Sequence, residues 1–288
     1  MKHISEDVDK VLLEKELFVA HKMDYVHFMD KPHFHDGFEI HFTLTNATTY
    51  QIDERVLVAD AGSVALFSPE EIHRVSIDRD KLYERYFLLF KPRFIDEMLL
   101  MSPFLLDIYF KKKKRDCIQL SVAQQVKFKN IFDELIELMA NDENDFYLLR
   151  AKLKLTELLV LLTELSEGEH VHNSSIVYEN NQVVADIVKY MKRNFMNDIT
   201  LDLLSDTFFV SKSTIIRLFK SVLGMTPTQY LIYVRIMKSR SYLEDGLTVK
   251  EVSEKVGYKD ESSFIKKFKE LQGVSPKQYI LKQLETEK

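Results

Sequence analysis

Arg217-Leu-Phe-Lys220 and Lys266-Lys-Phe-Lys269 are two copies of one pattern near the C-terminal end of the chain. Further matches follow each stretch in the same order: Gly224 and Gly273, Thr226-Pro227 and Ser275-Pro276, and Gln229-Tyr230 and Gln278-Tyr279. From Arg217 and Lys266 onward the copies are offset by 49 residues, and in the first helix of each copy, from Leu201 and Val249, by 48, so the second copy has one additional residue in its turn. A solenoid needs at least about three repeats. Two copies therefore predict a pair of similar small modules.

Each copy predicts a helix, a short turn and a second helix. In the first copy we expect Thr200 and Ser211 to cap the two helices, because their hydroxyl groups can accept hydrogen bonds from the first free backbone amides. Apolar residues recur at helical spacing in both helices: Leu201, Leu204 and Phe208, then Ile215, Leu218, Phe219 and Val222. Gly224 can adopt the left-handed conformation that ends a helix.

The second copy repeats this arrangement with a capping box. Thr248 and Glu251 are spaced so that each side chain can bond the backbone of the other residue. The predicted core residues are Val249, Val252 and Val256, then Phe264, Phe268 and Leu271. Gly257 is expected in the turn and Gly273 at the end of the second helix. Small Ser205 and Ser253 would allow the paired helices to cross closely, as a helix-turn-helix requires.

A further helix follows each copy. Thr226-Pro-Thr-Gln229 and Ser275-Pro-Lys-Gln278 both have the capping-box spacing, with proline at the first helical position. The first of these helices is predicted from Pro227 to about Glu244, which gives a length of about 27 Å at about 1.5 Å per residue. A rod of this size can hold two recognition helices near the ~34 Å repeat of the DNA major groove.

The double pattern resembles the AraC-type transcription regulators, whose DNA-binding domain carries two helix-turn-helix units joined by a long helix. The resemblance covers about residues 183–288 with the correct spacing in both copies. Thr214 and Ser263 stand where an aromatic residue is common, and Ser205 and Ser253 replace a usual alanine. These departures affect sequence preference and packing rather than the fold. The resemblance implies double-stranded DNA as a partner, and RNA polymerase as another if the protein is an activator.

Outward residues of the second helix in each copy are predicted to contact DNA. Those of the first copy are Lys212, Ser213, Thr214, Arg217 and Lys220. Those of the second copy are Glu261, Ser262, Ser263, Lys266, Lys267 and Lys269. Arg217 can make a bidentate contact with guanine, whereas Lys266 at the equivalent position is a point charge. The remaining lysines of both helices are expected to meet phosphates or to be ordinary surface residues.

The net charge of −5 is unfavourable for DNA binding when it is taken over the whole chain, but the two parts of the chain differ in charge. Residues 183–288 contain 18 Lys and Arg against 13 Asp and Glu, a balance of +5, whereas residues 1–182 contain 22 against 32, a balance of −10. Positive charge is therefore concentrated where phosphate contact is expected, although solvated surface would explain the same distribution. With 288 residues and 45% hydrophobic content, the chain has room for two globular domains.

Between about Lys22 and Lys91 the sequence is typical of short antiparallel strands. The runs are Phe38–Leu44, Tyr50–Ile52, Val56–Val58, Ser63–Phe67, His73–Ile77 and Tyr83–Phe90. Turn residues such as Asp60-Ala-Gly62 and Ser68-Pro69 separate them. Many short strands with tight turns predict a small barrel or jelly roll. Residues 1–20 are expected to form an arm or short helix that packs on this barrel.

A histidine-rich segment, His33-Phe-His35-Asp-Gly-Phe-Glu39, lies within the predicted barrel, and His73 follows later. It resembles the cupin pattern, in which two His, a Glu and a later His converge on a metal ion. His33 and His35 face the same way on a strand, so chelation is possible. The resemblance to AraC-type sensors implies instead a metal-free set near a pocket for an unidentified small molecule. We therefore assign the four residues to ligand binding without a cofactor, with metal binding as the alternative.

Two apolar stripes at helical spacing follow the barrel. They are Phe128, Ile131, Phe132, Leu135, Ile136, Leu138 and Met139, then Leu148, Leu149, Leu153, Leu155, Leu158, Leu159, Leu162 and Leu165. One small barrel cannot cover so much leucine-rich surface, so we expect homodimerisation through helices of residues 122–165, with intrachain packing as the alternative. Lys111-Lys-Lys-Lys-Arg115 is expected to be a solvated loop.

The expected fold class is α+β with several domains. The N-terminal cupin-like sensing domain spans residues 1–98, and a helical dimerisation or connecting region spans 99–168. A linker occupies 169–182 because of its polar composition, and the all-α domain with two helix-turn-helix units occupies 183–288.

No catalytic motif occurs in the sequence. Its seven glycines form no phosphate-binding loop, and the single cysteine, Cys117, has no nucleophile motif around it. One cysteine cannot form an internal disulfide. Without a long apolar run or an apolar signal segment, we expect a cytoplasmic protein that does not enter membranes. Two alternatives remain: a metal-dependent cupin enzyme that uses His33, His35, Glu39 and His73, and an architectural DNA binder without a pocket.

Overall fold

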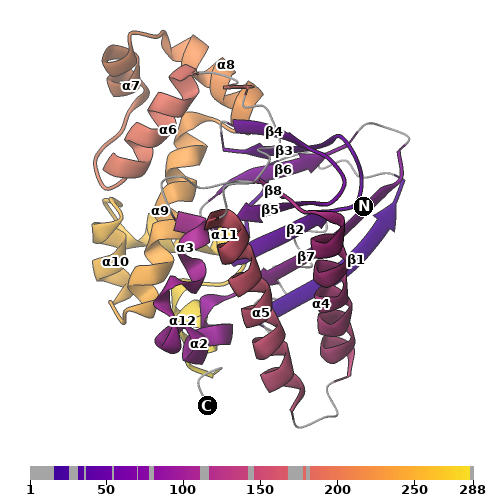
Figure 1. Ribbon diagram of the computed structural model, residues 1–288. Helices are drawn as coiled ribbons and strands as arrows, with labels where there is room; N and C mark the ends of the chain where they lie inside the picture. Colours follow the sequence, from indigo (N-terminus) through magenta and orange to yellow (C-terminus); the bar gives the residue numbers. More distant parts are fainter. Residues whose placement is uncertain are drawn as a thin grey trace. The chain divides into compact units, whose positions relative to one another are not determined.

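A computed structural model of the chain describes residues 16–25, 32–35, 37–53, 55–69, 71–77, 81–110, 117–141, 146–167, 178–179 and 182–285. The chain divides into two compact units, Met1–Tyr178 and Glu179–Lys288 (Figure 1). The predicted loop at residues 111–115, and most of the predicted linker at 169–182, lie outside the described residues.

The first unit contains two antiparallel sheets. Its strands are β1 (Leu17–Asp24), β2 (Phe38–Thr43), β3 (Thr48–Ile52), β4 (Arg55–Ala59), β5 (Ser63–Phe67), β6 (His73–Ser76), β7 (Tyr83–Phe90) and β8 (Cys117–Gln119), and the two-residue strand β9 (Tyr178–Glu179) lies at the boundary of the units. The order is β1-β7-β2-β5-β8 in one sheet and β6-β3-β4-β9 in the other. The six strands β2 to β7 confirm the predicted runs. This sheet-rich unit is the cupin-like domain that the sequence predicted.

The expectation of an arm or short helix before Lys22 is wrong for its described part. Residues 17–24 form β1, which pairs with β7 along its whole length, from Leu17 opposite Phe90 to Asp24 opposite Tyr83. Strand β7 offers a long free edge, and pairing with it satisfies backbone groups that a short isolated helix would leave to water. Strand β8 was also not predicted, because three residues are too few to show a strand pattern.

Helical segments follow β7 and cover one face of the first sheet. They are η1 (Pro92–Ile95), α2 (Asp96–Met101), η2 (Pro103–Leu106), α3 (Asp107–Phe110), α4 (Val122–Ala140) and α5 (Tyr147–Glu167). Figure 1 shows α4 and α5 as an antiparallel pair beside the strands. The aromatic ring of Phe42 on β2 packs against Phe128 and Phe132 of α4, and the hydroxyl of Tyr86 donates to Asp133 at 2.8 Å. Burying this apolar sheet face therefore fixes the helix pair in place.

The second unit is all helical. Its helices are α6 (Gln182–Asn194), α7 (Leu201–Phe208), α8 (Lys212–Leu223), α9 (Pro227–Glu244), α10 (Val249–Lys255), α11 (Glu261–Gln272) and α12 (Pro276–Glu285). Helices α7 and α8 form one helix-turn-helix unit, and α10 and α11 form the other. Helix α9 joins them with the predicted bounds, and side chains on all its faces are buried, including Tyr230, Tyr233 and Ile236.

The helix ends confirm the predicted local chemistry. The hydroxyl groups of Thr200 and Ser211 accept hydrogen bonds from backbone amides three residues later. Complete capping boxes begin α9 and α10, and a matching set of bonds joins Ser275 and Gln278 before α12. One predicted core residue is wrong, because Leu271 is 37% exposed. Leu271 lies in the last turn of α11, whereas Phe264 and Phe268 earlier in the helix are buried.

Arg235 connects the two helix-turn-helix units from the middle of α9. Its Nε atom donates to the carbonyl oxygen of Phe195 and its Nη2 atom to that of Asn197, both at 2.8 Å. The guanidinium group also lies over the ring of Tyr258, 5.6 Å from its centroid. Phe195 and Asn197 precede the first unit and Tyr258 lies in the turn of the second, so one side chain fixes both to the central helix.

Candidate functional site

The interior of the first unit is built on the alternation of β2. Phe38, Ile40 and Phe42 face the helices and belong to the core with α4 and α5. Glu39, His41 and Thr43 therefore lie on the opposite face, and all three are buried. Polar residues on a buried strand face need hydrogen-bond or ionic partners, so this face is a candidate ligand site rather than ordinary core.

The structure brings together the four residues predicted for ligand binding. The Nε2 atom of His73 lies 3.1 Å from Oε2 of Glu39, and Nε2 of His35 lies 3.7 Å from the same oxygen. Backbone bonds of 2.9 and 2.8 Å join His33 to His73 in an isolated bridge. The possible ligand atoms of the three histidines all lie within 4.8 Å of one another. The sequence thus identified a real cluster; its binding role stays a prediction.

Electrostatics keep the Glu39 carboxyl group ionised. Burial by itself raises the pKa of this group, but the contact with His73 and the positive charge of His73, His35 and His41, when protonated, outweigh it. The pKa is lowered from 4.5 to about 2. A carboxylate at this depth needs positive charge near it.

A second buried polar group was not predicted. His41 Nδ1 lies 2.8 Å from the hydroxyl of Tyr50, and His41 Nε2 lies 3.0 Å from the hydroxyl of Tyr83. Burial raises the pKa of both phenols well above the ordinary value. The signal was present in the sequence, because His41 is two residues from Glu39 on a strand. The ring is held by a bond at each nitrogen and so forms a rigid part of the interior.

The predicted DNA-contacting residues of the first copy lie on α8. Arg217 and Lys220 are exposed, opposite buried Ile215 and Phe219. Lys212 forms an ion pair with Asp202 on α7. Ser213 and Thr214 are near the helix start, where both hydroxyl groups bond the capping residue Ser211. Four of the five predicted residues of this copy are therefore exposed, and Thr214 is partly buried.

The corresponding residues of the second copy lie on α11. Ser262, Ser263, Lys266 and Lys269 are exposed, whereas Glu261 and Lys267 are partly buried. Lys267 also forms an ion pair of 2.6 Å with Glu270, which offsets part of its charge. Asp260 caps this helix by accepting from the backbone amide of Ser263 at 2.8 Å. Helices α8 and α11 are therefore alike, because each has one side-chain cap at its start and exposed cations on its outer face.

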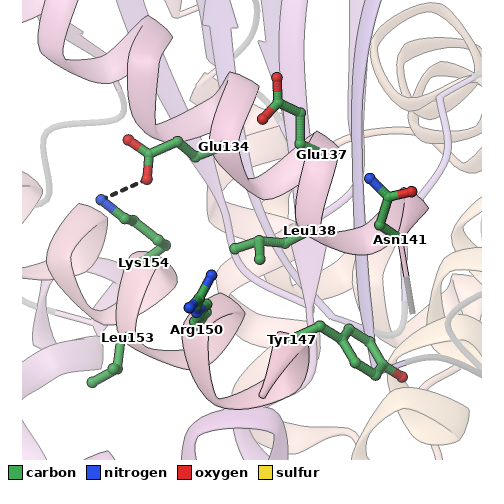
Figure 2. A pocket seen from close by; sticks show the side chains of 8 residues that line it. All are labelled: Glu134, Glu137, Leu138, Asn141, Tyr147, Arg150, Leu153 and Lys154. Carbon is green, nitrogen blue, oxygen red and sulfur yellow. Dashed lines mark ion pairs between the residues drawn. The ribbon is translucent and has the colours of Figure 1, made fainter. Parts of the chain in front are cut away.

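A groove of about 430 Å³ lies between α4 and α5. Figure 2 shows its lining, with two acidic residues on α4 and two basic residues on α5: Glu134, Glu137, Leu138, Asn141, Tyr147, Arg150, Leu153 and Lys154. Lys154 pairs with Glu134 across it at 2.8 Å. Leu153 of this lining is 51% exposed, and Leu149, one turn earlier on α5, is 49% exposed. These two leucines were predicted to belong to one continuous stripe with Leu155 and Leu158, of which only the latter pair is buried.

These features define a class of protein, in which a cupin-like unit with a polar interior precedes a domain of two helix-turn-helix units. Comparison with known families agrees with both parts. Residues 15–159 match the AraC-like ligand binding domain, and residues 204–282 match a helix-turn-helix domain. The first match covers half of the chain. The chain therefore belongs to the AraC family of transcription regulators, as its repeated pattern predicted.

Named relatives share part of the chain. The transcriptional activator RhaS of Escherichia coli O1:K1 is 28% identical over 148 residues, 50% of this chain and 49% of that protein. The lactose operon transcription activator of Staphylococcus xylosus is 28% identical over 85 residues, 29% of this chain and 30% of that protein. This chain thus spans at most about half the length of these relatives. Both relatives are described as activators of transcription.

Two solved structures are also similar to this chain. The C-terminal domain of AraT, a response regulator from Geobacillus stearothermophilus, is 30% identical, covering 35% of this chain and 84% of that one, with a TM-score of 0.34. ToxT from Vibrio cholerae with a bound unsaturated fatty acid is 13% identical, covering 92% of this chain and 95% of that one, with a TM-score of 0.39.

Proposed function

We propose that this chain is a sequence-specific, DNA-binding transcription regulator whose two recognition helices read successive segments of the major groove. The observation that carries the proposal is the duplicated helix-turn-helix on one central helix, with exposed cations on α8 and α11. Family membership supports it. In this proposal residues 183–288 bind double-stranded DNA, and an activator would also contact RNA polymerase. Within the part of the chain that the structure describes, no helix is both long and apolar enough to cross a membrane.

Selection from random double-stranded DNA tests this proposal. We expect an enriched site with two conserved segments about one helical turn apart, each read by one unit. The affinity should fall steeply with salt because basic residues displace counterions from phosphate. Binding without any sequence preference would contradict the proposal and favour the architectural alternative.

The effector of this regulator is proposed to be a small molecule bound in the first unit, near His33, His35, Glu39 and His73. Three of these polar side chains are buried and His33 is partly buried, and polar groups that converge inside a sheet-rich unit are a usual basis for orienting a ligand. Screening metabolites by thermal unfolding tests it. A ligand at 100 times its dissociation constant should stabilise the unit by about 2.7 kcal/mol. A hit that stabilises Glu39→Gln equally well would place the ligand elsewhere.

Homodimerisation through α4 and α5 is the third part of the proposal. Leu149, Leu153 and Val160 are all at least 40% exposed and are spaced by four and seven residues, so they follow one face of α5. The adjacent groove has acidic residues on α4 and basic ones on α5. Such a surface is self-complementary about a two-fold axis.

Light scattering at about 10 μM and above, with and without DNA, tests the dimer. We expect a dimer for the native chain and a monomer for Leu149→Glu combined with Leu153→Glu. Leu100→Glu is the matched control, because Leu100 is an exposed leucine on α2. A native monomer under both conditions would contradict this part.

A further inference from the structure

We propose that Arg235 positions the two recognition helices relative to each other, and so determines the spacing of the two DNA segments that this regulator accepts. Helices α8 and α11 belong to different helix-turn-helix units, and both pack against α9, which carries Arg235 in its middle. Arg235 is not among the residues predicted to contact DNA, so it acts through the residues that it holds. Such a role rests on the DNA-binding function proposed above.

Apolar packing joins both units to α9 without favouring one direction. The ring of Phe219 on α8 packs edge to face on Tyr230 of α9, with centroids 6.0 Å apart, and further buried side chains lie on all faces of α9. The free energy of apolar burial is non-directional. Hydrogen bonds have preferred distances and angles, so polar contacts are needed to hold the two units at one angle.

The guanidinium group of Arg235 holds the segment that leads into the first unit. Its Nε atom donates to the carbonyl oxygen of Phe195 and its Nη2 atom to that of Asn197, both at 2.8 Å. Hydrogen bonds from a charged donor are stronger than neutral ones. Because the donors of a guanidinium have a fixed planar geometry, two bonds to one segment set its orientation as well as its distance. Helix α7 begins soon afterwards at Leu201, so this orientation is passed to the first unit.

The same guanidinium group contacts the turn of the second unit. Its central carbon lies 5.6 Å from the centroid of the Tyr258 ring, which is within the range of about 6 Å for cation–π attraction. The Tyr258 ring in turn packs edge to face on Phe264 of α11, with centroids 5.5 Å apart. Arg235 is therefore linked to the second recognition helix through a single ring.

The segment before α7 and the turn of the second unit also meet directly beside Arg235. A Cβ atom at Gly257 would lie 2.4 Å from the carbonyl oxygen of Met196 and 3.0 Å from Nη2 of Arg235. Lys259 and Asp198 form an ion pair of 2.9 Å at the same junction, but both side chains are exposed, and exposed pairs contribute little. Arg235 is partly buried, so its bonds are better shielded from water.

DNA makes a change in this geometry costly. Successive base pairs lie about 3.4 Å apart, and about 10–10.5 of them complete one turn. One base pair inserted between the two segments therefore moves the second segment by about 3.4 Å and rotates it by about 35°. To follow that segment, α11 would have to move relative to α8 by a similar amount, which would disrupt the contacts of Arg235 with both units. The native chain should therefore accept one spacing.

Binding of the full-length chain to DNA sites of different spacing tests this role. One base pair is inserted or removed between the two segments of the site that the native chain selects from random DNA. The native chain should lose affinity about 10-fold or more for each change, because one segment is then read out of register. Arg235→Met keeps a long side chain over Tyr258 but has no donor, so its loss on the altered sites should be only about 3-fold or less. Arg235→Lys can bond one carbonyl oxygen but lacks the fork, so its loss should be intermediate.

Arg193→Met is the matched control. Arg193 is an exposed arginine in the last turn of α6, and any phosphate contact that it loses affects all spacings alike. This variant should therefore keep the native ratio of affinities between spacings. Circular dichroism shows whether each variant is folded, and if Arg235→Met does not fold, Arg235→Lys serves for the same measurement.

Two results would overturn the proposal and leave the regulatory function intact. One is a folded Arg235 variant with the native ratio of affinities, since a merely structural role would lower stability and the affinity for every spacing alike. The other is a native chain that prefers one DNA sequence but tolerates every spacing. Absence of any sequence preference in the native chain would instead contradict both proposals, so the two failures are distinguishable.

Discussion

The two helix-turn-helix units have the same backbone conformation at equivalent positions, but different neighbours pack against those positions. Phe209 and Gly257 occupy the same position of the repeat, where the first helix of each unit ends. Both have left-handed backbones, with φ of 55° and 86°. Phe209 is 94% exposed. A Cβ atom at Gly257 would instead lie 2.4 Å from the carbonyl oxygen of Met196.

This difference shows how one repeated pattern serves two structural demands. The backbone conformation is required by the turn itself, and it costs any residue with a Cβ atom about 1–2 kcal/mol. In the second unit another backbone segment also lies close to the turn, so this position additionally requires a residue without a Cβ atom. In the first unit the equivalent residue is exposed to solvent. Arg235 organises the contact in the second unit by bonding the carbonyl oxygens of Phe195 and Asn197 on either side of Met196.

Gly257→Ala should have the largest effect on stability. The added methyl group combines left-handed strain with a clash against backbone that Arg235 holds in place. We expect a loss of about 2–4 kcal/mol, the range for strain together with overpacking. Calorimetric unfolding of the full-length chain measures it. Gly246→Ala is the control, because Gly246 also has positive φ but no atom within 4 Å of the added carbon; equal losses in the two variants would contradict the clash.

Arg217→Ala and Lys266→Ala should separate the two units in DNA recognition. Arg217 is expected to read one guanine, so its loss should relax preference at one base pair and cost about 1–3 kcal/mol there. Lys266 has the equivalent position but lacks a bidentate fork, so its loss should change base preference less. Affinities across variants of the selected DNA site measure both. Unchanged base preference in Arg217→Ala would refute this docking of α8.

Phosphate contacts provide the comparison for that experiment. Lys269→Ala should weaken binding to all sequences alike and reduce the salt slope by about 1. Lys267→Ala should act in the same direction but less, because Lys267 is already paired with Glu270 at 2.6 Å. Salt titrations of both variants on one DNA site check the order.

Phe209→Gly should change stability in the opposite direction from Gly257→Ala. Glycine removes about 1–2 kcal/mol of left-handed strain but loses about 0.5–1 kcal/mol through the greater freedom of the unfolded chain. The exposed ring loses little packing, so we expect a gain of about 0.5 kcal/mol in the free energy of unfolding. Phe209→Ala keeps the strain and removes the ring. If it stabilises as much as Phe209→Gly, exposure rather than backbone strain is the cause.

Local sequence patterns predicted most of the helices and strands, because helix capping and strand alternation depend on residues that are close together in the sequence. Caps such as Ser211 and the alternation of β2 follow from spacing along a few residues. Strand β1 was missed because it is defined by the free edge of β7, which is about 65 residues away along the chain. The exposure of Leu149 and Leu153 was missed for a similar reason, since a stripe does not show which of its residues the sheet covers.

The candidate sites also combine features that the sequence predicts with features that depend on tertiary contacts. The sequence predicted that His33, His35, Glu39 and His73 lie together, and the fold supplies the backbone bridge that joins His33 to His73. The tyrosine partners of His41 come from β3 and β7, and no local pattern pairs them. The close approach of Met196 to Gly257 is likewise a tertiary contact that spacing cannot reveal.

The smallest difference between the units should appear at their first helix caps. Thr200 only accepts a bond from Leu203, at 3.1 Å. Thr248 accepts from the backbone amide of Glu251, and its own hydroxyl, which alanine lacks, donates to the Glu251 carboxylate at 2.6 Å. We expect about 1 kcal/mol of destabilisation from either threonine-to-alanine change at neutral pH, with Thr248→Ala greater by a few tenths.

Acid should remove the excess destabilisation of Thr248→Ala over Thr200→Ala and leave the loss that the two variants share. The side-chain and backbone hydrogen bonds from Thr248 lower the pKa of Glu251 below its ordinary value of 4.5. A lowered pKa stabilises the folded chain above 4.5, and this contribution is lost as the pH falls through the folded-state pKa. The unfolding temperatures of both variants, measured relative to the native chain from pH 7 to pH 3, should therefore converge in acid. If the excess loss of Thr248→Ala persists at pH 3, the reciprocal bond to the carboxylate is not its source, and the two caps differ for another reason.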